Sequence, residues 1–323
     1  MAVRKAVALL QKGNPVALPT ETVYGLAADA LDPIAIAKIF EAKGRPRFDP
    51  LIVHLPDRDW LERVAEIPSA GRQLLEKLVD RFWPGPFTIV LSRRSIVPEI
   101  VTAGLDTVAV RISAHPIFGE IIRGFGRPLA VPSANRFGRV SPTTAQHVLE
   151  ELEGRIPLIV DAGPTEHGIE STIVAMRDAK IDILRRGPIT PEQLSSFAEV
   201  GIITSAEKIS APGQLPSHYA PKTPLRLLEN INSFSPAENQ RVALLAWNPV
   251  EPKERFVVIR RLSERSDLRE AAANLFRQLR ELDQLDLDLI VAEPVPEDGL
   301  GAAIMDRLRR ASQRQLDGQG TPE

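Results

Sequence analysis

The stretch PVALPTETVYGL, residues 15–26, decides the fold of the first part of the chain. It opens with a short apolar run between two prolines, which predicts a strand at Pro15–Pro19. Two threonines, a glutamate and a tyrosine follow, although Thr, Val and Tyr are poor turn residues. Polar side chains of this kind at the end of a strand predict a binding site for a small polar ligand.

Outward from this stretch, short apolar strands alternate with helices up to about residue 200. A helix at Asp32–Lys43 is indicated by Asp32 as N-cap, Pro33 in the first turn and Gly44 as the stop. A second helix is predicted at Thr143–Glu153. The alternation predicts an α/β (α+β) fold with strand-end loops available for a site. Further strands are predicted at Leu51–Leu55, Phe87–Leu91, Val108–Ile112, Leu129–Val131, Leu158–Val160, Thr172–Ala175 and Ile181–Leu184.

The pattern breaks over residues 204–223, where prolines predict an extended linker. After it, a strand–helix–strand–helix order predicts a small α/β domain. We therefore predict domains at 1–203 and 224–316, joined by the linker and followed by a frayed tail at 317–323. The C-terminal domain is expected to have strands at Leu225–Leu228, Val242–Trp247, Phe256–Ile259 and Leu287–Ala292, and helices at Asp267–Leu285 and Gly301–Ala311.

Composition excludes several classes of function. The chain has 323 residues and no cysteine, so disulfides, thiolate nucleophiles and cysteine-ligated metals are absent. Its 5 histidines never stand three or four apart, which excludes a histidine pair on one helix face. Apolar runs are too short to span a bilayer, and the N-terminus lacks the features of a signal peptide. We therefore expect a cytoplasmic protein without membrane segments.

Charge argues against a general nucleic-acid binder. The net charge is −2, and residues 1–200 hold 24 Lys+Arg against 24 Asp+Glu. A non-specific nucleic-acid binder is expected to carry a strong positive field instead.

Polar clusters follow several of the predicted strands, and each has an ordinary explanation. The basic loop Lys43–Arg47 is explained by solvation, Arg111 by a buried ion pair, Ser133–Asn135 by turn chemistry and Arg185 by a surface turn. Together, however, they occupy strand ends and predict one concave site lined by hydroxyls and cations. Such a site positions substrates and neutralises charge, as phosphoryl or nucleotidyl transfer requires. The sequence lacks both usual glycine-rich nucleotide-binding motifs, so ATP would bind by another arrangement.

Several ordered motifs resemble the YrdC-like threonylcarbamoyl-AMP synthases in their longer, two-domain form. The resemblance is dense up to about Gly187 and looser after Pro224. It implies a YrdC-like twisted mixed sheet with flanking helices, plus a smaller C-terminal Rossmann-like α/β domain. The matching stretches are residues 19–26, 43–46 with 50–54, 107–111, 132–135 with 141–143, 168–172 and 218–221.

The resemblance implies a nucleotidyltransferase. Threonine and bicarbonate would form N-carboxythreonine, whose carbamate oxygen attacks the α-phosphate of ATP and releases pyrophosphate. The product, threonylcarbamoyl-AMP, would pass through partner proteins to an adenosine next to the anticodon of certain tRNAs. Mg²⁺ is expected to accompany ATP, without direct protein ligands.

The same resemblance implies roles for individual residues. The expected catalytic residues are Lys43, Arg45, Ser133 and Asn135. The expected L-threonine site consists of Thr22, His54, Arg111, Val131 and Ser171. The expected ATP site consists of Arg45, Asp49, Thr107, Ser133, Ser141, Arg185 and Tyr219, the last from a linker that resembles a lid.

Some positions depart from the family's pattern. Asp49 stands where asparagine is expected, so we predict that it faces a cation or metal. Arg186 replaces the usual proline, and Gln214–Pro216 replaces a more basic, aromatic stretch of the linker.

Three alternatives use the same fold. A double-stranded RNA- or tRNA-binding protein is disfavoured by the balanced charge and the lack of aromatic stacking clusters. Carbamoyl transfer in hydrogenase maturation requires zinc-binding cysteines, which are absent. A regulatory protein without catalysis is disfavoured by the intact Lys43/Arg45 and Ser133/Asn135 pairs.

Overall fold

The computed structural model describes residues 1–46, 49–177, 180–203, 219–249 and 255–313, and its chain separates into two compact units. Unit 1 comprises Met1–Phe137, Pro142–Glu166 and Glu170–Gln214, and unit 2 comprises Gly138–Ser141, His167–Ile169 and Leu215–Glu323. Most of the predicted linker and the whole predicted tail lie outside the described residues. The boundaries at 203 and 223 therefore stay predictions.

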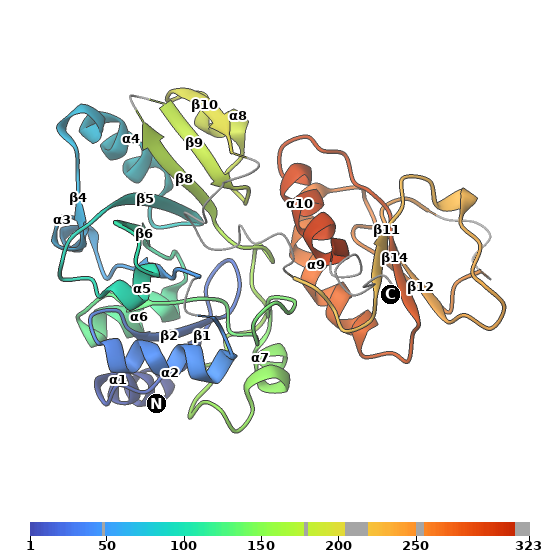
Figure 1. The fold of residues 1–323 in the computed structure, drawn as a ribbon, viewed down its shortest axis with the longest axis horizontal. Helices are drawn as coiled ribbons and strands as arrows, with labels where there is room; N and C mark the ends of the chain where they lie inside the picture. The colour runs from blue at the N-terminus through green and yellow to red at the C-terminus, as the bar shows by residue number, and fades with distance from the viewer. Residues whose placement is uncertain (47–48, 178–179, 204–218, 250–254, 314–323) are drawn as a thin grey trace, which may run out of the picture. The chain divides into compact units, whose positions relative to one another are not determined.

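Unit 1 is built on one mixed sheet in the order β1-β2-β7-β3-β6-β5-β8-β9-β10, with β4 paired to β5 (Figure 1). Parallel and antiparallel pairs alternate irregularly, as the predicted α/β (α+β) class allows. The strands are β1 (Val16–Leu18), β2 (Gly25–Asp29), β3 (Ile52–His54), β4 (Ala65–Glu66), β5 (Phe87–Arg93), β6 (Thr107–Arg111), β7 (Leu129–Ala130), β8 (Thr172–Arg177), β9 (Lys180–Arg185) and β10 (Glu199–Ile202).

Most helices of unit 1 cover one face of this sheet. Their apolar side chains join Val53, Ile89 and Val110 of the central strands in one core. The burial of this large apolar surface is the main force that holds the sheet and helices together. The helices in this core are α2 (Pro33–Lys43), α3 (Leu61–Val64), α4 (Arg72–Phe82), α5 (Glu99–Thr102), α7 (Ala145–Leu152) and α8 (Pro191–Leu194).

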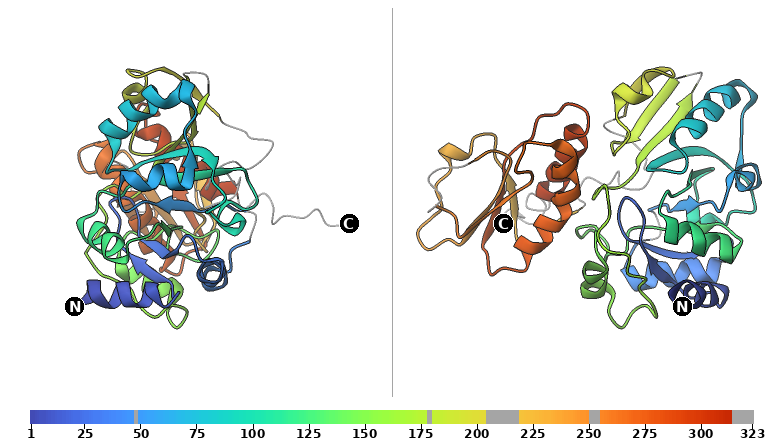
Figure 2. Two further views of the ribbon diagram at one scale, coloured as in Figure 1. Left: turned by 90° about the vertical axis from the view of Figure 1, so that its left-hand side faces the viewer. Right: turned by 180° about the vertical axis from the view of Figure 1, so that it is seen from behind.

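The opposite face is divided. Helices α1 (Ala2–Gln11) and α6 (Pro116–Phe125) lie side by side and form a second core with β1, β2 and residues 129–131 (Figures 1 and 2). Farther along, the buried apolar cluster on this face contains only strand residues, among them Ile52, Val90 and Ala109, together with Ile203. No described helix contributes to that cluster, so the middle of this face is available to carry a site.

Local sequence signals explain the helix ends. Asp32 accepts a hydrogen bond from the Ile34 amide at 2.9 Å, and Gly44 ends α2 in the left-handed conformation with φ 59°, so both predicted signals are confirmed. The helix predicted from Thr143 instead begins at Ala145, because the hydroxyl of Thr144 accepts from the His147 amide and caps it.

The predicted strand at Leu158–Val160 was wrong in extent. Only Ile159 forms a bridge, with Ala17 of β1, and the two hydrogen bonds of this bridge run from the Ala17 amide to the Leu158 carbonyl and from the Val160 amide to the Ala17 carbonyl. Conversely, β2 follows the polar motif directly and was not predicted, since its small residues GLAAD lack the apolar alternation of a strand.

Unit 2 has a parallel sheet in the order β11-β14-β12-β13, which confirms the predicted α/β arrangement. Both helices lie on one face of this sheet, and Ile231, Phe234 and Phe256 pack on the other (Figure 1). The elements are β11 (Leu225–Leu227), β12 (Val242–Ala246), β13 (Val258–Arg261), α9 (Leu268–Asp283), β14 (Leu289–Ala292) and α10 (Gly301–Ser312).

Two short segments from earlier in the chain belong to unit 2. The backbone carbonyl of Gly138 accepts from the Ala220 amide at 3.0 Å, and the guanidinium of Arg280 donates to the carbonyl of Ser141 at 3.4 Å. Gly168 has φ 68°, and a Cβ there would lie 2.5 Å from the carbonyl oxygen of Ala272 in α9. This close approach requires glycine.

Among the described residues, no helix is both long enough and apolar enough to cross a membrane.

We predict that Asp32→Ala lowers the free energy of unfolding of unit 1 by about 1 kcal/mol, because the Ile34 amide loses its cap. Asp32→Asn keeps a hydrogen-bond acceptor and is expected to lower the free energy of unfolding by only about a few tenths of a kcal/mol. Urea unfolding followed by the fluorescence of Trp60 and Trp83 measures this, in a Trp247→Phe background because Trp247 lies in unit 2. Identical unfolding curves for wild type and Asp32→Ala would contradict the cap.

Candidate active site

Strand register places the candidate side chains in rows on the divided face. His54 of β3 pairs with Arg111 of β6, and Ile89 pairs with Val110, so Thr88 of β5 lies opposite Arg111. Side chains of directly paired residues on neighbouring strands point to the same face of the sheet, so His54, Arg111 and Thr88 form one row. The amide of Val131 donates to the carbonyl of Ile52 at 2.9 Å, which places Val131 in the neighbouring row.

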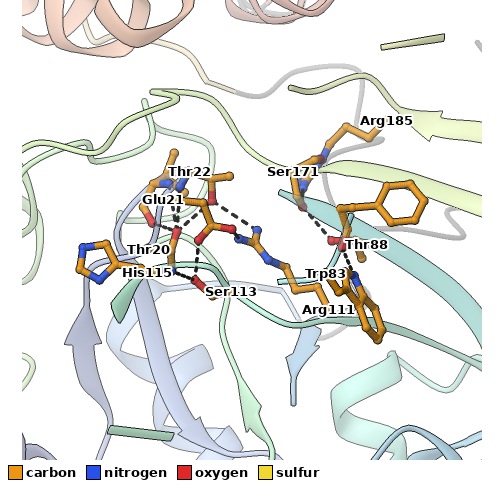
Figure 3. Close-up of polar contacts among 12 residues, drawn as sticks. Thr20, Glu21, Thr22, Trp83, Thr88, Arg111, Ser113, His115, Ser171 and Arg185 are labelled. Atoms are coloured by element: carbon orange, nitrogen blue, oxygen red, sulfur yellow. Dashed lines mark hydrogen bonds and ion pairs between the residues drawn. The ribbon is translucent and has the colours of Figure 1, made fainter. Parts of the chain in front are cut away.

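A buried ion pair lies at the centre of the site. The Nη2 of Arg111 donates to Oε1 of Glu21 at 2.5 Å, and its Nη1 donates to the Thr22 hydroxyl at 3.3 Å (Figure 3). The hydroxyl of Ser113 donates to the other carboxylate oxygen of Glu21. The side chains of Arg111 and Glu21 are only 3% and 4% exposed. Burial raises the pKa of Glu21, but Arg111, Ser113 and two backbone amides together lower it by more than burial raises it. The pKa of Glu21 therefore lies below its usual value.

The polar motif at residues 20–24 is held by its own side chains. The Thr20 hydroxyl accepts from the amides of Thr22 and Val23, at 3.1 and 3.2 Å, and donates to the carbonyl of Val23 at 2.7 Å. This local turn orients the Glu21 carboxylate toward Arg111. The phenol of Tyr24 donates to the Gly163 carbonyl at 2.7 Å, so Tyr24 is structural.

His54 is a buried histidine beside this pair. Neither ring nitrogen has a hydrogen-bond partner among the described residues, and the ring lies 5.1 Å from that of Phe118. Burial and the positive charge of Arg111 lower the pKa of His54 well below 6.5. The imidazole is therefore neutral near pH 7 and offers a donor and an acceptor to a ligand.

Ser171 joins the row from the next strands. Its hydroxyl lies 2.8 Å from that of Thr88 and accepts from Nη2 of Arg185 at 3.1 Å, while Nε of Arg185 donates to its carbonyl at 3.1 Å (Figure 3). Ser171 and Arg185 thus stand together beside the Arg111 row.

Lys43 supports a different part of the site. Its ammonium donates to the backbone carbonyls of Ser133, at 2.5 Å, and of Asn135. Burial, followed by the charge of Arg45, lowers the pKa of Lys43 well below 10.5. The last residue of α2 therefore holds the turn that carries Ser133 and Asn135.

Arg45 and Asp49 form an ion pair of 2.8 Å, which confirms the prediction that Asp49 faces a cation. Burial raises the pKa of Asp49, while Arg45, Lys43 and Arg185 oppose that shift. These four charges are therefore close enough to act on one another. Three cations thus act on Asp49, and Glu151 acts on Lys43 as well, in contrast to the one-to-one Glu21–Arg111 pair.

Three other predicted site residues lie outside the row of His54, Arg111 and Thr88. Thr107 begins β6 and Arg111 ends it, which separates them by about 13 Å along the strand. Ser141 and Tyr219 belong to unit 2. There, the Tyr219 ring is 5.4 Å from the ring of Phe276 and lies under the guanidinium of Arg307.

The sequence did not point to three residues that contact the site: Glu21, Ser113 and Thr88. Glu21 belongs to the quoted motif but was not assigned a role, and Ser113 follows Arg111 by two residues. Thr88 had the clearest signal, because it is a polar residue inside an otherwise apolar strand. Within the described ranges, no group of three or more His, Asp or Glu side chains is arranged to hold a metal ion.

Comparison with known families covers nearly the whole chain. The Sua5/YciO/YrdC family model, described as telomere recombination, matches residues 8–187. The threonylcarbamoyl-AMP synthase C-terminal domain model matches residues 189–313.

Individual relatives agree. The threonylcarbamoyl-AMP synthase of Pyrococcus abyssi is 40% identical over 96% of this chain and 94% of its own length. That of Bacillus subtilis is 39% identical over 96% of this chain and 92% of its own. The crystal structure of P. abyssi Sua5 complexed with L-threonine superposes with a TM-score of 0.87 at 39% identity, covering 96% of this chain and 94% of that one.

We predict that His54 makes unit 1 less stable in mild acid. The unfolded chain protonates His54 near pH 6.5 and the native state does not, so stability falls as the pH drops below 6.5. His54→Gln removes this pH dependence of the free energy of unfolding, which amounts to at most about 1.4 kcal/mol per pH unit. Urea unfolding between about pH 6.5 and pH 5 measures it, and parallel pH profiles of the two proteins would contradict it.

Proposed function

The chain belongs to the threonylcarbamoyl-AMP synthase family, and from this premise we propose that it makes threonylcarbamoyl-AMP from L-threonine, bicarbonate and ATP. The threonine amine and bicarbonate combine to N-carboxythreonine with loss of water. A carbamate oxygen then attacks the α-phosphorus of ATP. The bond between the α-phosphorus and the oxygen that bridges to the β-phosphorus breaks, and pyrophosphate leaves.

One observation supports this reaction above all, namely the different charge of the two parts of the site. The Glu21–Arg111 pair is balanced, while Lys43, Arg45 and Arg185 all act on Asp49, and Glu151 acts on Lys43 as well. A zwitterionic amino acid suits the balanced part, and a triphosphate suits the cationic part.

We assign L-threonine to Thr22, His54, Arg111, Val131 and Ser171. Arg111 can bind the substrate carboxylate through Nε, which is buried without a hydrogen-bond partner among the described residues. The neutral imidazole of His54 offers a donor and an acceptor to the polar groups of the substrate. The backbone of Val131 and the hydroxyls of Thr22 and Ser171 complete this part.

We assign ATP to Arg45, Asp49, Thr107, Ser133, Ser141, Arg185 and Tyr219. In this scheme Lys43 and Asn135 order the turn that presents Ser133. Arg45 and Arg185 offset charge that develops on the leaving pyrophosphate. The Asp49 carboxylate attracts both arginines and so offsets their mutual repulsion.

Mg²⁺ fits this site as a companion of ATP. One oxygen of Asp49 is in an ion pair with Arg45, and we expect the phosphates and water to hold the ion. When bound, Mg²⁺ neutralises charge on the pyrophosphate. We place the reaction in the cytoplasm, and its product goes to threonylcarbamoyl-transfer proteins that modify tRNA.

The first test measures pyrophosphate release with ATP, Mg²⁺, bicarbonate and threonine, and leaves out one component at a time. We expect release to depend on both threonine and bicarbonate. Release that is indifferent to threonine would refute the assignment. Complete absence of release would refute it too and favour an RNA-binding role, which a salt titration of tRNA binding then tests.

Arg111→Lys provides a test of the threonine assignment. Lysine keeps the charge but loses the planar fork, so KM for threonine should rise about 10- to 100-fold while KM for ATP changes little. Arg177→Lys, at an arginine 68% exposed on β8, is the matched control and should leave both constants unchanged. Equal rises in the two KM values would place Arg111 outside the threonine site.

A further inference from the structure

Glu21 has no role in the assignments above, yet it is the only buried carboxylate bonded to Arg111 among the described residues. Its Oε1 accepts from Arg111 and its Oε2 accepts from Ser113, so both carboxylate oxygens already have a protein donor. Glu21 therefore acts on a ligand through its charge and through Arg111.

The charge of the residues around Arg111 determines which ligand the site accepts. Arg111 contributes one positive charge, Glu21 cancels it, and the neighbouring His54 is neutral. A zwitterion leaves this balance unchanged. A simple carboxylate bound to Arg111 would leave one uncompensated negative charge in a buried place, which is strongly unfavourable.

We propose that Glu21 is a specificity-determining residue that makes the Arg111 site select zwitterionic α-amino acids over carboxylates without an ammonium group. The proposal rests on the proposed function, because it takes Arg111 to be the partner of the substrate carboxylate. Glu21 is the counterion that keeps Arg111 from accepting any small carboxylate that enters. This selection acts on the ligand that enters the site, whereas N-carboxythreonine and the adenylate, which also lack an ammonium group, form there from threonine that is already bound.

The other charged and titratable groups nearby do not replace Glu21 in this role. His54 on β3 is neutral, and burial lowers the pKa of the half-buried His115 at the start of α6 although Glu21 opposes that shift. Arg185 on β9 bonds to Ser171 and lies close enough to Asp49 to affect its pKa. Glu21 and Arg111 alone thus form a direct ion pair within the described part of this row.

The test compares the dissociation constants of L-threonine and of (R)-3-hydroxybutanoate, which is threonine without its amino group. Wild type should bind threonine at least 100-fold more tightly than this analogue. In Glu21→Gln, which keeps the shape and loses the charge, the ratio of the two constants should fall at least tenfold. Ser113→Ala, which removes a hydrogen bond and keeps the charge, should stay within threefold of the wild-type ratio.

A folded Glu21→Gln that binds threonine with an unchanged ratio overturns the proposal while the proposed function stands. Wild type that fails to bind threonine overturns the proposed function, and this inference with it. An analogue that wild type binds as tightly as threonine also overturns the proposal.

If Glu21→Gln does not fold, wild type decides the question by proton linkage. The analogue must bring a proton with it to preserve the charge balance, to its own carboxylate or to His54. Its dissociation constant is measured by competition with threonine. It should fall about tenfold for each pH unit by which the pH is lowered between about pH 7.5 and pH 6, while the dissociation constant of threonine stays constant. The same pH dependence for both ligands overturns the proposal.

Discussion

The buried ion pair between Glu21 and Arg111 is the constraint around which the site is organised. It joins two segments 90 residues apart in the chain, and neither side chain reaches water to a useful extent. Two charges buried without each other would each cost several kcal/mol, so the motif at residues 20–24 and the end of β6 must stay together. That requirement explains the local turn made by Thr20 and the second hydrogen bond from Ser113.

The sheet supplies the rest of the geometry. Because β3, β6 and β5 are neighbours and their paired residues point to the same face, His54, Arg111 and Thr88 form one row, with Phe118 of α6 against His54 at one end. The opposite face is occupied by helices and forms the main core. The core thus fixes the strands, and the strands fix the spacing of the polar groups.

Charge divides the site along the same sheet. On the Arg111 side one arginine pairs with one carboxylate, and on the other side Lys43, Arg45 and Arg185 act on Asp49, with Glu151 acting on Lys43. Burial keeps His54 neutral and lowers the pKa of Lys43, so neither group behaves as it would in water. The proposed L-threonine and ATP sites therefore use different cations.

The sequence by itself determined the α/β class, the capped helix α2, the family and the residue types of the site, because these follow from short-range patterns and ordered motifs. It could not show that Glu21 meets Arg111, that Thr88 meets Ser171 or that Lys43 bonds to the 133–135 turn. Those contacts join residues more than 80 positions apart, and strand register and burial decide them. Only the tertiary structure decided which charges cancel, because cancellation depends on distance and on exclusion from water.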